Sequence, residues 1–291
     1  MSVWTDFSGL PIRQTFYNAK GIRTRVIEGG EQNGEVLICL HGTGGHAEAF
    51  SRNFRAHIPH YRMISMDMIG HGYTDAPDID YTLQTLVDHL GDMVATLGCK
   101  RVAISGESLG AMVGAHYAIQ NPDRVSKLVM TTGLLVGRTS EDRVALKDVL
   151  DRSLKATGAL TRETIRARLA WLMHKPERDV TDELVELRHT IYSQPGRAQI
   201  MSRISNLILG GLLDDAWIAR WSNEQELRKL QCQVLLVWST YNPDLSAAAA
   251  RAALPNIPRG EMVVLEDSAH WPQWEETARF DETQLRFLKS A

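Results

Sequence analysis

The sequence predicts one α/β domain, a mostly parallel, doubly wound sheet with an inserted helical cap. Short segments rich in β-branched and apolar residues alternate with helical patterns, which is typical of a parallel sheet. Several of these segments, such as 234–238, are hydrophobic at every position, as expected of central strands covered on both faces. We therefore expect helices on both faces of the sheet. The predicted strands lie at 25–28, 36–40, 63–66, 102–105, 128–131, 234–238 and 262–265.

The alternation of strands and helices stops near residue 133 and resumes near residue 233. We expect residues 134–222 to form the helical cap, and residues 1–133 together with 223–291 to form the α/β core. Ligands of open parallel sheets bind beyond the carboxyl ends of the strands, so a cap entering there would cover the site. The cap region is rich in Arg, Leu, Glu and Ala and has helical periodicity at 141–157, 162–173 and 181–192.

Composition narrows the possible functions. The 291 residues are 44% hydrophobic and carry a formal charge of −3, and no run of like charge would attract nucleic acid or a membrane. No stretch approaches the roughly 18 apolar residues of a membrane-spanning helix. The three cysteines form no Cys-x-x-Cys pair, and no His cluster has metal-ligand spacing, so we expect free thiols and no cofactor or metal. The N-terminus lacks signal-peptide features, which predicts a cytoplasmic protein. The expected partner is a small-molecule substrate.

The pentapeptide Gly-Glu-Ser-Leu-Gly at 106–110 is the first chemical signal. It follows a predicted strand and precedes a helix-like run at 111–117, and this strand, sharp turn and helix is the setting of a nucleophile elbow. Glycine at both ends leaves room for a close approach of strand and helix, and the helix N-terminus adds electrostatic stabilisation. Ser108 is therefore predicted to be the nucleophile of a serine hydrolase with the α/β-hydrolase fold.

A glycine-rich loop at 41–46, His-Gly-Thr-Gly-Gly-His, directly follows the predicted strand 36–40. Such a loop can direct backbone N–H groups toward a developing oxyanion. A phosphate-binding loop fits less well, because no Lys-Ser or Lys-Thr follows the glycines. Thr43 and Leu109 are the predicted donors of the oxyanion hole.

His270 is the candidate general base. It comes just after the last predicted strand, 262–265, where the fold's chain order of Ser, acid and His places the base. The other histidines have no comparable position.

The position expected for the triad acid is occupied by an amide, because Asn242 follows the strand 234–238 where an acid is expected. An amide can accept a hydrogen bond from the imidazole Nδ1–H group but brings no charge to stabilise the imidazolium. In a serine protease the corresponding replacement cost about 10⁴ in turnover. Three interpretations stay open: Asp244 reaches the histidine through a reshaped loop, Asp267 substitutes for the acid, or the site works as Ser-His-Asn.

With these motifs and the segment His-Trp-Pro-Gln-Trp-Glu at 270–275, the chain resembles the meta-cleavage product hydrolases, which break carbon–carbon bonds in aromatic degradation. The likeness runs over most of the chain. Members of that family have the nucleophile elbow, a His-Trp followed by Gln-x-Glu, and a cap arginine in a segment similar to 180–188. The cap segment is the more specific match, because esterases share the elbow but need no such arginine.

Carried over by position, the resemblance implies that Ser108 and His270 act on a 2-hydroxy-6-oxo-dienoate. Arg188, Trp271 and Gly42 would bind its carboxylate and dienol end, and arginine suits bidentate recognition of a carboxylate. From the residues alone, Arg188 would be a solvated arginine in a charged helix and Trp271 a packing aromatic. The family also suggests a homodimer.

Three functions are consistent with these residues. The first is the carbon–carbon bond hydrolase. The second is a carboxylesterase or lactonase of the same fold, which needs only the serine and the histidine. The third is a non-hydrolytic protein that keeps the pocket, suggested by Asn242. Glu107 precedes the nucleophile where many relatives have Asn, and this difference leaves the identity of the substrate open.

Overall fold

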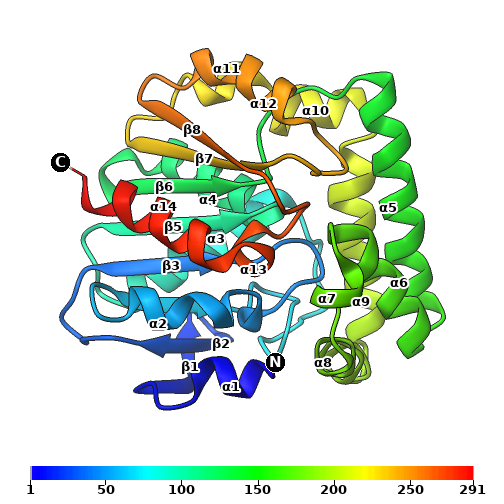
Figure 1. The fold of residues 1–291 in the computed structure, drawn as a ribbon, viewed down its shortest axis with the longest axis horizontal. Helices are drawn as coiled ribbons and strands as arrows, with labels where there is room; N and C mark the ends of the chain where they lie inside the picture. The colour runs from blue at the N-terminus through cyan, green and yellow to red at the C-terminus, as the bar shows by residue number, and fades with distance from the viewer. Residues whose placement is uncertain (1, 291) are drawn as a thin grey trace.

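The computed structural model describes residues 2–290 and contains an eight-stranded sheet in the order β1-β2-β4-β3-β5-β6-β7-β8 (Figure 1). β2 pairs antiparallel with β1 and with β4, whereas all other neighbouring strands are parallel. The predicted α/β fold with a mostly parallel sheet is confirmed. The strands are β1 (Ile12–Ala19), β2 (Ile22–Gly29), β3 (Val36–Leu40), β4 (Arg62–Met66), β5 (Val102–Glu107), β6 (Val125–Thr131), β7 (Gln233–Ser239) and β8 (Gly260–Leu265).

Each predicted strand coincides with an observed one, but β1 was not predicted. This strand reads Ile-Arg-Gln-Thr-Phe-Tyr-Asn-Ala and lies at the edge of the sheet, where most of its side chains are at least partly exposed. It therefore lacks the continuous apolar run that marks the central strands.

Helices cover both faces of the sheet. In β3, Leu37 and Cys39 belong to one hydrophobic cluster, whereas Ile38 and Leu40 belong to another, because successive strand residues point to opposite faces. Helices α3 (Leu83–Thr96) and α4 (Leu109–Gln120) lie behind the sheet in Figure 1, and α14 (Thr277–Lys289) lies in front of it. This arrangement confirms the doubly wound topology.

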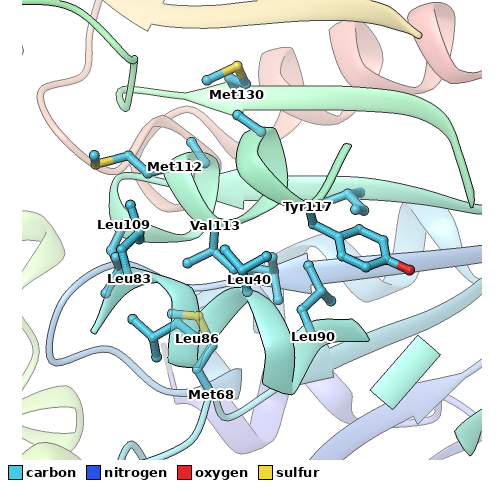
Figure 2. Close-up of a cluster of buried hydrophobic side chains, with 14 of the residues drawn as sticks. Leu40, Met68, Leu83, Leu86, Leu90, Leu109, Met112, Val113, Tyr117 and Met130 are labelled. Atoms are coloured by element: carbon cyan, nitrogen blue, oxygen red, sulfur yellow. The ribbon is translucent and has the colours of Figure 1, made fainter. Parts of the chain in front are cut away.

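The packing around α4 fixes the start of that helix. In Figure 2, Leu109, Met112 and Val113 of α4 lie close to Leu40 of β3 and Leu83 of α3. All five side chains are buried. Burial of each large aliphatic side chain contributes about 1.5–3 kcal/mol to folding. The turn between β5 and α4 is thus anchored by a well-packed core.

Cap helices lie together beyond one end of the sheet, at the right of Figure 1. Three of them coincide with the predicted helical segments, and Thr139, Thr161 and Thr181 cap their N-termini by accepting a backbone hydrogen bond. The domain limits at 134 and 222 stay a prediction. The helices of this region are α5 (Ser140–Gly158), α6 (Arg162–Leu172), α7 (Pro176–Asp179), α8 (Asp182–Tyr192) and α9 (Arg197–Ser205), followed by η3 (Asn206–Gly210) and α10 (Asp215–Trp221).

Short helices complete the fold. They are α1 (Val3–Phe7), η1 (Ala47–Asn53), α2 (Phe54–His57), η2 (Pro122–Arg124), α11 (Glu224–Leu227), α12 (Ala247–Ala253), η4 (Leu254–Asn256) and α13 (Pro272–Glu275).

No helix in the described part of the chain is both long and apolar enough to cross a membrane. Within residues 2–290, no three His, Cys, Asp or Glu side chains form a group that could hold a metal ion.

Candidate active site

Ser108 occupies a strained turn between β5 and α4. Its φ of 52° and ψ of −113° lie outside the regions that L-residues favour, at a cost of about 1–3 kcal/mol. Its N–H group donates to the Thr131 carbonyl at 2.9 Å, and its carbonyl accepts from the Ala111 N–H group at 3.1 Å. The next strand and the first turn of α4 therefore fix the strained backbone. This geometry is that of a nucleophile elbow, and Ser108 lines a cavity.

Two glycines permit the close turn. A Cβ atom on Gly110 would lie 2.2 Å from the carbonyl oxygen of Leu40, and one on Gly106 would lie 2.3 Å from the carbonyl group of Gly110. No side chain fits at either position. The flanking glycines are required because the strand and the helix approach each other too closely there for a side chain, as the sequence suggested.

The loop after β3 lies at the same cavity as Ser108. Within residues 2–290, the backbone N–H groups of Thr43 and Leu109 donate to no protein acceptor. Leu109 begins α4, and the first N–H groups of a helix have no partner within it. Both donors are therefore free for an oxyanion, and their role stays a prediction. The N–H group of Gly42 differs, because it donates to Glu107 Oε2 at 2.6 Å.

The loops after β7 and β8 bring Asn242 to His270. His270 Nδ1 and Asn242 Oδ1 are 2.7 Å apart. The Asn242 Nδ2 group donates to the Leu245 carbonyl at 2.8 Å, which fixes the amide with its oxygen toward the histidine. Nδ1 therefore carries the proton, and Nε2 is left as the acceptor that a general base needs. Asn242 selects the same tautomer that a triad acid would select.

A carboxylate accompanies the amide. Asp244 Oδ1 lies 3.5 Å from His270 Nδ1 and, among the described residues, has no hydrogen-bond partner. Burial lowers the pKa of His270, and the negative charge of Asp244 opposes this effect. Asp267 instead pairs with Lys175 and lies 3.6 Å from Arg178 at the surface. The geometry thus removes Asp267 from the three interpretations and places both Asn242 and Asp244 beside the base.

The buried carboxylate of Glu275 fixes the loop that carries His270. Its Oε1 atom accepts the N–H groups of Ala269 at 3.0 Å and Trp271 at 3.1 Å. Its Oε2 atom accepts the N–H group of His174, between α6 and α7, at 2.6 Å. Glu275 therefore links the histidine loop to the cap. This contact gives the Glu of the Gln-x-Glu motif a structural role that the sequence did not reveal.

Glu107 places a buried carboxyl group next to the nucleophile. Its Oε1 atom lies 3.4 Å from His270 Nε2 and has no hydrogen-bond partner within the described chain. Burial raises the pKa of Glu107 to about 8, against the opposing effects of the Gly42 N–H group and Arg188. At neutral pH Glu107 is therefore mostly a neutral acid. Because Oε2 accepts the Gly42 N–H group, we place the proton on Oε1.

Two buried arginines of the cap lie over the site, Arg188 on α8 and Arg168 on α6. The Arg188 guanidinium carbon lies 5.4 Å from the centroid of the Trp271 ring, and its Nε and Nη2 atoms have no partner among residues 2–290. Arg168 Nε donates to Ser153 Oγ at 2.7 Å, and its Nη1 atom is without a partner there. Burial lowers the pKa of both groups, to about 10 for Arg168. Sequence reasoning missed Arg168, because no motif marks it.

One small cavity between core and cap brings most of these residues together. Its volume is about 20 Å³, which is room for one water molecule. A larger substrate therefore requires the cap or the lining side chains to move. Arg188 and Asn242 lie outside the lining, next to residues that form it. The lining residues are Gly42, Thr43, Glu107, Ser108, Val149, Arg168, Trp171, Leu172, Leu209, Asp244, His270 and Trp271.

Known sequences resemble this chain, one of them over most of its length and another over less than half of it. The family model described as the alpha/beta hydrolase fold matches residues 35–277. A 2-hydroxymuconate semialdehyde hydrolase from Pseudomonas putida is 27% identical over 278 residues, covering 94% of this chain and 93% of that protein. A 2-hydroxy-6-oxo-6-(2'-aminophenyl)hexa-2,4-dienoic acid hydrolase from Metapseudomonas resinovorans is 38% identical over 130 residues. That match covers 42% of this chain and 44% of the relative.

A solved structure has the same fold. The 2-hydroxy-6-oxo-6-phenylhexa-2,4-dienoate hydrolase from Rhodococcus sp. strain RHA1 matches with a TM-score of 0.84 and 16% sequence identity. The match covers 97% of this chain and 100% of that chain. At this identity the likeness establishes the fold alone.

Proposed function

The chain belongs to the alpha/beta hydrolase fold family, and from this premise we propose that it is a serine hydrolase that cleaves a carbon–carbon bond in a 2-hydroxy-6-oxo-dienoate. The observation that carries the proposal is Arg188, buried beside Trp271 with two guanidinium nitrogens unpartnered among the described residues. A buried cation is costly unless an anion binds it, and a substrate carboxylate is such an anion. An esterase of this fold needs no such cation.

His270 performs the first chemical step. The substrate enters as a dienol, with a hydroxyl group on C2 and a ketone at C6. Nε2 takes the proton of the C2 hydroxyl group and delivers it to C5, which leaves a ketone at C2 and a CH₂ group at C5. C5 then becomes a leaving group, because its electron pair can delocalise through the C3–C4 double bond onto the C2 oxygen.

Ser108 then attacks the C6 ketone. Its Oγ atom passes a proton to His270 Nε2, and the N–H groups of Thr43 and Leu109 stabilise the oxyanion. Collapse of this adduct breaks the C5–C6 bond, and the electron pair moves to the C2 oxygen, which takes the proton from His270. Water, activated by His270, hydrolyses the acyl-serine. The products are a carboxylic acid and 2-hydroxypenta-2,4-dienoate.

The test is turnover of 2-hydroxy-6-oxohepta-2,4-dienoate by the native chain. We expect loss of the yellow dienolate absorbance together with equimolar acetate and hydroxypentadienoate. A substrate that keeps its colour with excess enzyme contradicts the proposal. Turnover of p-nitrophenyl esters alone would identify a carboxylesterase or lactonase. Failure of a serine-reactive phosphonate to label Ser108 would favour the non-hydrolytic alternative.

Replacement of Glu107 by glutamine is expected to extend activity to higher pH. In the native chain, ionisation of Glu107 near pH 8 places a negative charge beside the substrate carboxylate, so kcat/KM should fall as the pH rises through that value. A single ionisation gives a fall of about tenfold per pH unit. Glutamine keeps an oxygen for the Gly42 N–H group and cannot ionise. Profiles of kcat/KM against pH check this, and an alkaline fall that persists in Glu107→Gln contradicts it.

The homodimer and the cytoplasmic location remain proposals that rest on the resemblance and on the sequence. Light scattering on the native chain tests the first. A mass of one chain at micromolar concentration would contradict it.

A further inference from the structure

We propose that only one part of the cap moves to admit a ligand, namely α5 together with η3, while α6, α7, α8 and α9 stay attached to the core. The cavity beside Ser108 has a volume of about 20 Å³ and holds about one water molecule, so part of its wall must move before a larger ligand can enter. This inference goes beyond the proposed function, because it applies to any ligand of the cavity. We call α5 and η3 the mobile part and α6 to α9 the attached part of the cap.

The helices α6 and α7 are bonded to the loop that carries the base. The N–H group of His270 itself donates to the carbonyl of Leu172, the last residue of α6, at 2.8 Å. Trp274 Nε1 donates to the carbonyl of Asp179, the last residue of α7, at 3.2 Å, in addition to the contact of Glu275 described above. Motion of α6 or α7 would therefore break a backbone hydrogen bond of the catalytic base.

The helices α8 and α9 are bonded to core loops at both ends of this helix pair. Near the start of α8, Glu183 accepts the N–H group of Val3 at 2.7 Å. Further along, four side chains donate to backbone carbonyl groups of the loops after β3 and β4. These bonds are Tyr192 Oη to Gly44 at 3.1 Å, Gln194 Nε2 to Gly72 at 3.0 Å, Arg197 Nη2 to Thr74 at 2.8 Å and Arg203 Nη2 to Ile79 at 2.6 Å.

The mobile part has no such bonds. Within residues 2–290, the hydrogen bonds and ion pairs of α5 and η3 all go to residues of the cap, 134–222. Arg143, for example, donates to the Leu213 carbonyl at 2.9 Å, and Ser153 Oγ accepts from Arg168 Nε at 2.7 Å. Apolar side chains of α5 and η3 make the remaining contacts, and such contacts are not directional. The mobile part can therefore shift without breaking a described hydrogen bond to the core.

A glycine lies near each end of α5, and packing requires neither. A Cβ atom on Gly137 or on Gly158 would meet no neighbour of the described chain within 4 Å, and neither glycine has a positive φ. These glycines differ from Gly106 and Gly110, where a Cβ atom would collide with backbone. Glycine has more backbone freedom than any other residue, so both ends of α5 have flexible joints.

The segment η3 lies between two anchored elements. Before it, α9 is bonded to the loop after β4, and after it α10 ends at Trp221, whose carbonyl lies 2.8 Å from His116 Nε2 of α4. η3 is a π-helical turn, a conformation that is frequent at functional sites and at bends of helices. Gly210 and Gly211 follow each other at its end. The chain can therefore bend at η3 while the flanking helices stay in place.

The division of the cap has a consequence for catalysis. Val149 of α5 and Leu209 of η3 line the cavity, so motion of the mobile part withdraws two apolar side chains from its wall. α5 runs along the outer side of the cap in Figure 1, where it can move away from the sheet. Arg168 and Arg188 lie on the attached part and keep their place beside His270. The site thus opens without disturbing the groups that perform the chemistry.

Distances between spin labels test which part moves. One pair joins Ala95→Cys on α3 of the core to Val144→Cys on α5, and the matched pair joins Ala95→Cys to Ala167→Cys on α6. All three positions are exposed, and Cys99→Ser removes a native thiol that is partly exposed. We expect a broader distance distribution for the α5 pair than for the α6 pair. After phenylmethanesulfonyl fluoride has labelled Ser108, the α5 pair alone should shift, by roughly 2 Å or more.

Three results would overturn the proposal. Equal shifts of both pairs would mean that the cap moves as one rigid body, and a shift of the α6 pair alone would mean that α6 is the mobile element. Equal widths with no shift in either pair would mean that only side chains rotate. Because the comparison of widths requires neither ligand nor reaction, it decides on the mobile part even if the proposed function fails.

Stiffer joints should slow entry into the cavity. Alanine fits at positions 137 and 158 and restricts the backbone there. For the double variant Gly137→Ala with Gly158→Ala, we expect labelling of Ser108 by phenylmethanesulfonyl fluoride to be roughly threefold to tenfold slower than in the native chain. Methanesulfonyl fluoride, which has the same reactive group but is smaller, is the control and should be slowed less. Unchanged rates would overturn the assignment of the joints, and equal slowing of both reagents would place the effect on Ser108 itself.

Discussion

Replacement of Ser108 by alanine is expected to lower kcat for carbon–carbon cleavage by about 10⁴-fold or more. The hydroxyl group forms the bond to C6, and Glu107, the other polar side chain of the turn, is mostly a neutral acid at neutral pH. The effect should be confined to cleavage, because the preceding tautomerisation uses His270 Nε2 and not the serine oxygen. Single-turnover absorbance with product analysis checks this, and we expect a rapid spectral change of the dienol without release of the acid.

A matched variant distinguishes the two steps. His270→Ala should lose the rapid spectral change as well as cleavage, because both protons pass through Nε2. Alanine has the same backbone requirements as serine at the strained position 108, so Ser108→Ala should fold with a midpoint near that of the native chain. Acid release by Ser108→Ala at more than about 1% of the native rate would mean that water attacks C6 without the serine. This result would refute the assignment of Ser108 as the nucleophile.

The fold could be predicted because its signals are local. The strands are continuous apolar runs, and the elbow needs glycine at 106 and 110 for steric reasons that the structure reproduces. The edge strand β1 was not predicted, because a strand exposed at the edge of the sheet has no continuous hydrophobic run. Local patterns therefore identify elements that are buried on both sides and miss those that are not.

The site could be predicted only in part, because its electrostatics depend on contacts between distant segments. Arg168 and Glu107 are 61 positions apart in the numbering and meet at one cavity only after the cap folds over the core. The Glu275 carboxylate similarly accepts a hydrogen bond from His174, 101 positions away. No spacing rule predicts such pairs, whereas the order of serine, acid position and histidine follows from the order of the strands.

The small size of the cavity increases the effect of the charges around it. A space of about 20 Å³ has room for about one water molecule, so electrostatic interactions there are screened less than in bulk water. Two arginines, one carboxylate and one carboxyl group with a pKa of about 8 then give the site an excess of positive charge at neutral pH. An anionic substrate relieves this imbalance when it enters, which favours the dienoate over a neutral ester.

The second large effect is expected at Asp244. Asp244→Asn should lower kcat/KM by about 10² to 10³, which is the usual cost of removing one electrostatic stabiliser of the transition state. The loss should be smaller than when a triad acid is replaced, because Asn242 still fixes the tautomer of His270. The variant should also move the acidic limb of the kcat/KM profile to lower pH, because Asp244 opposes the lowering of the His270 pKa by burial. Replacement of a residue that only supports the structure would leave the pH of this acidic limb unchanged.

Exchange of the two residues tests how they divide the task of the triad acid. Asn242→Asp alone should give no large gain, because its carboxylate would lose the bond that Asn242 Nδ2 donates to the Leu245 carbonyl and would lie near the charge of Asp244. The double variant Asn242→Asp with Asp244→Asn restores one charge in direct contact with His270 Nδ1, and it should recover most of the activity lost in Asp244→Asn. A gain of orders of magnitude from Asn242→Asp alone would instead mean that the native site is an impaired triad in which Asp244 takes no part.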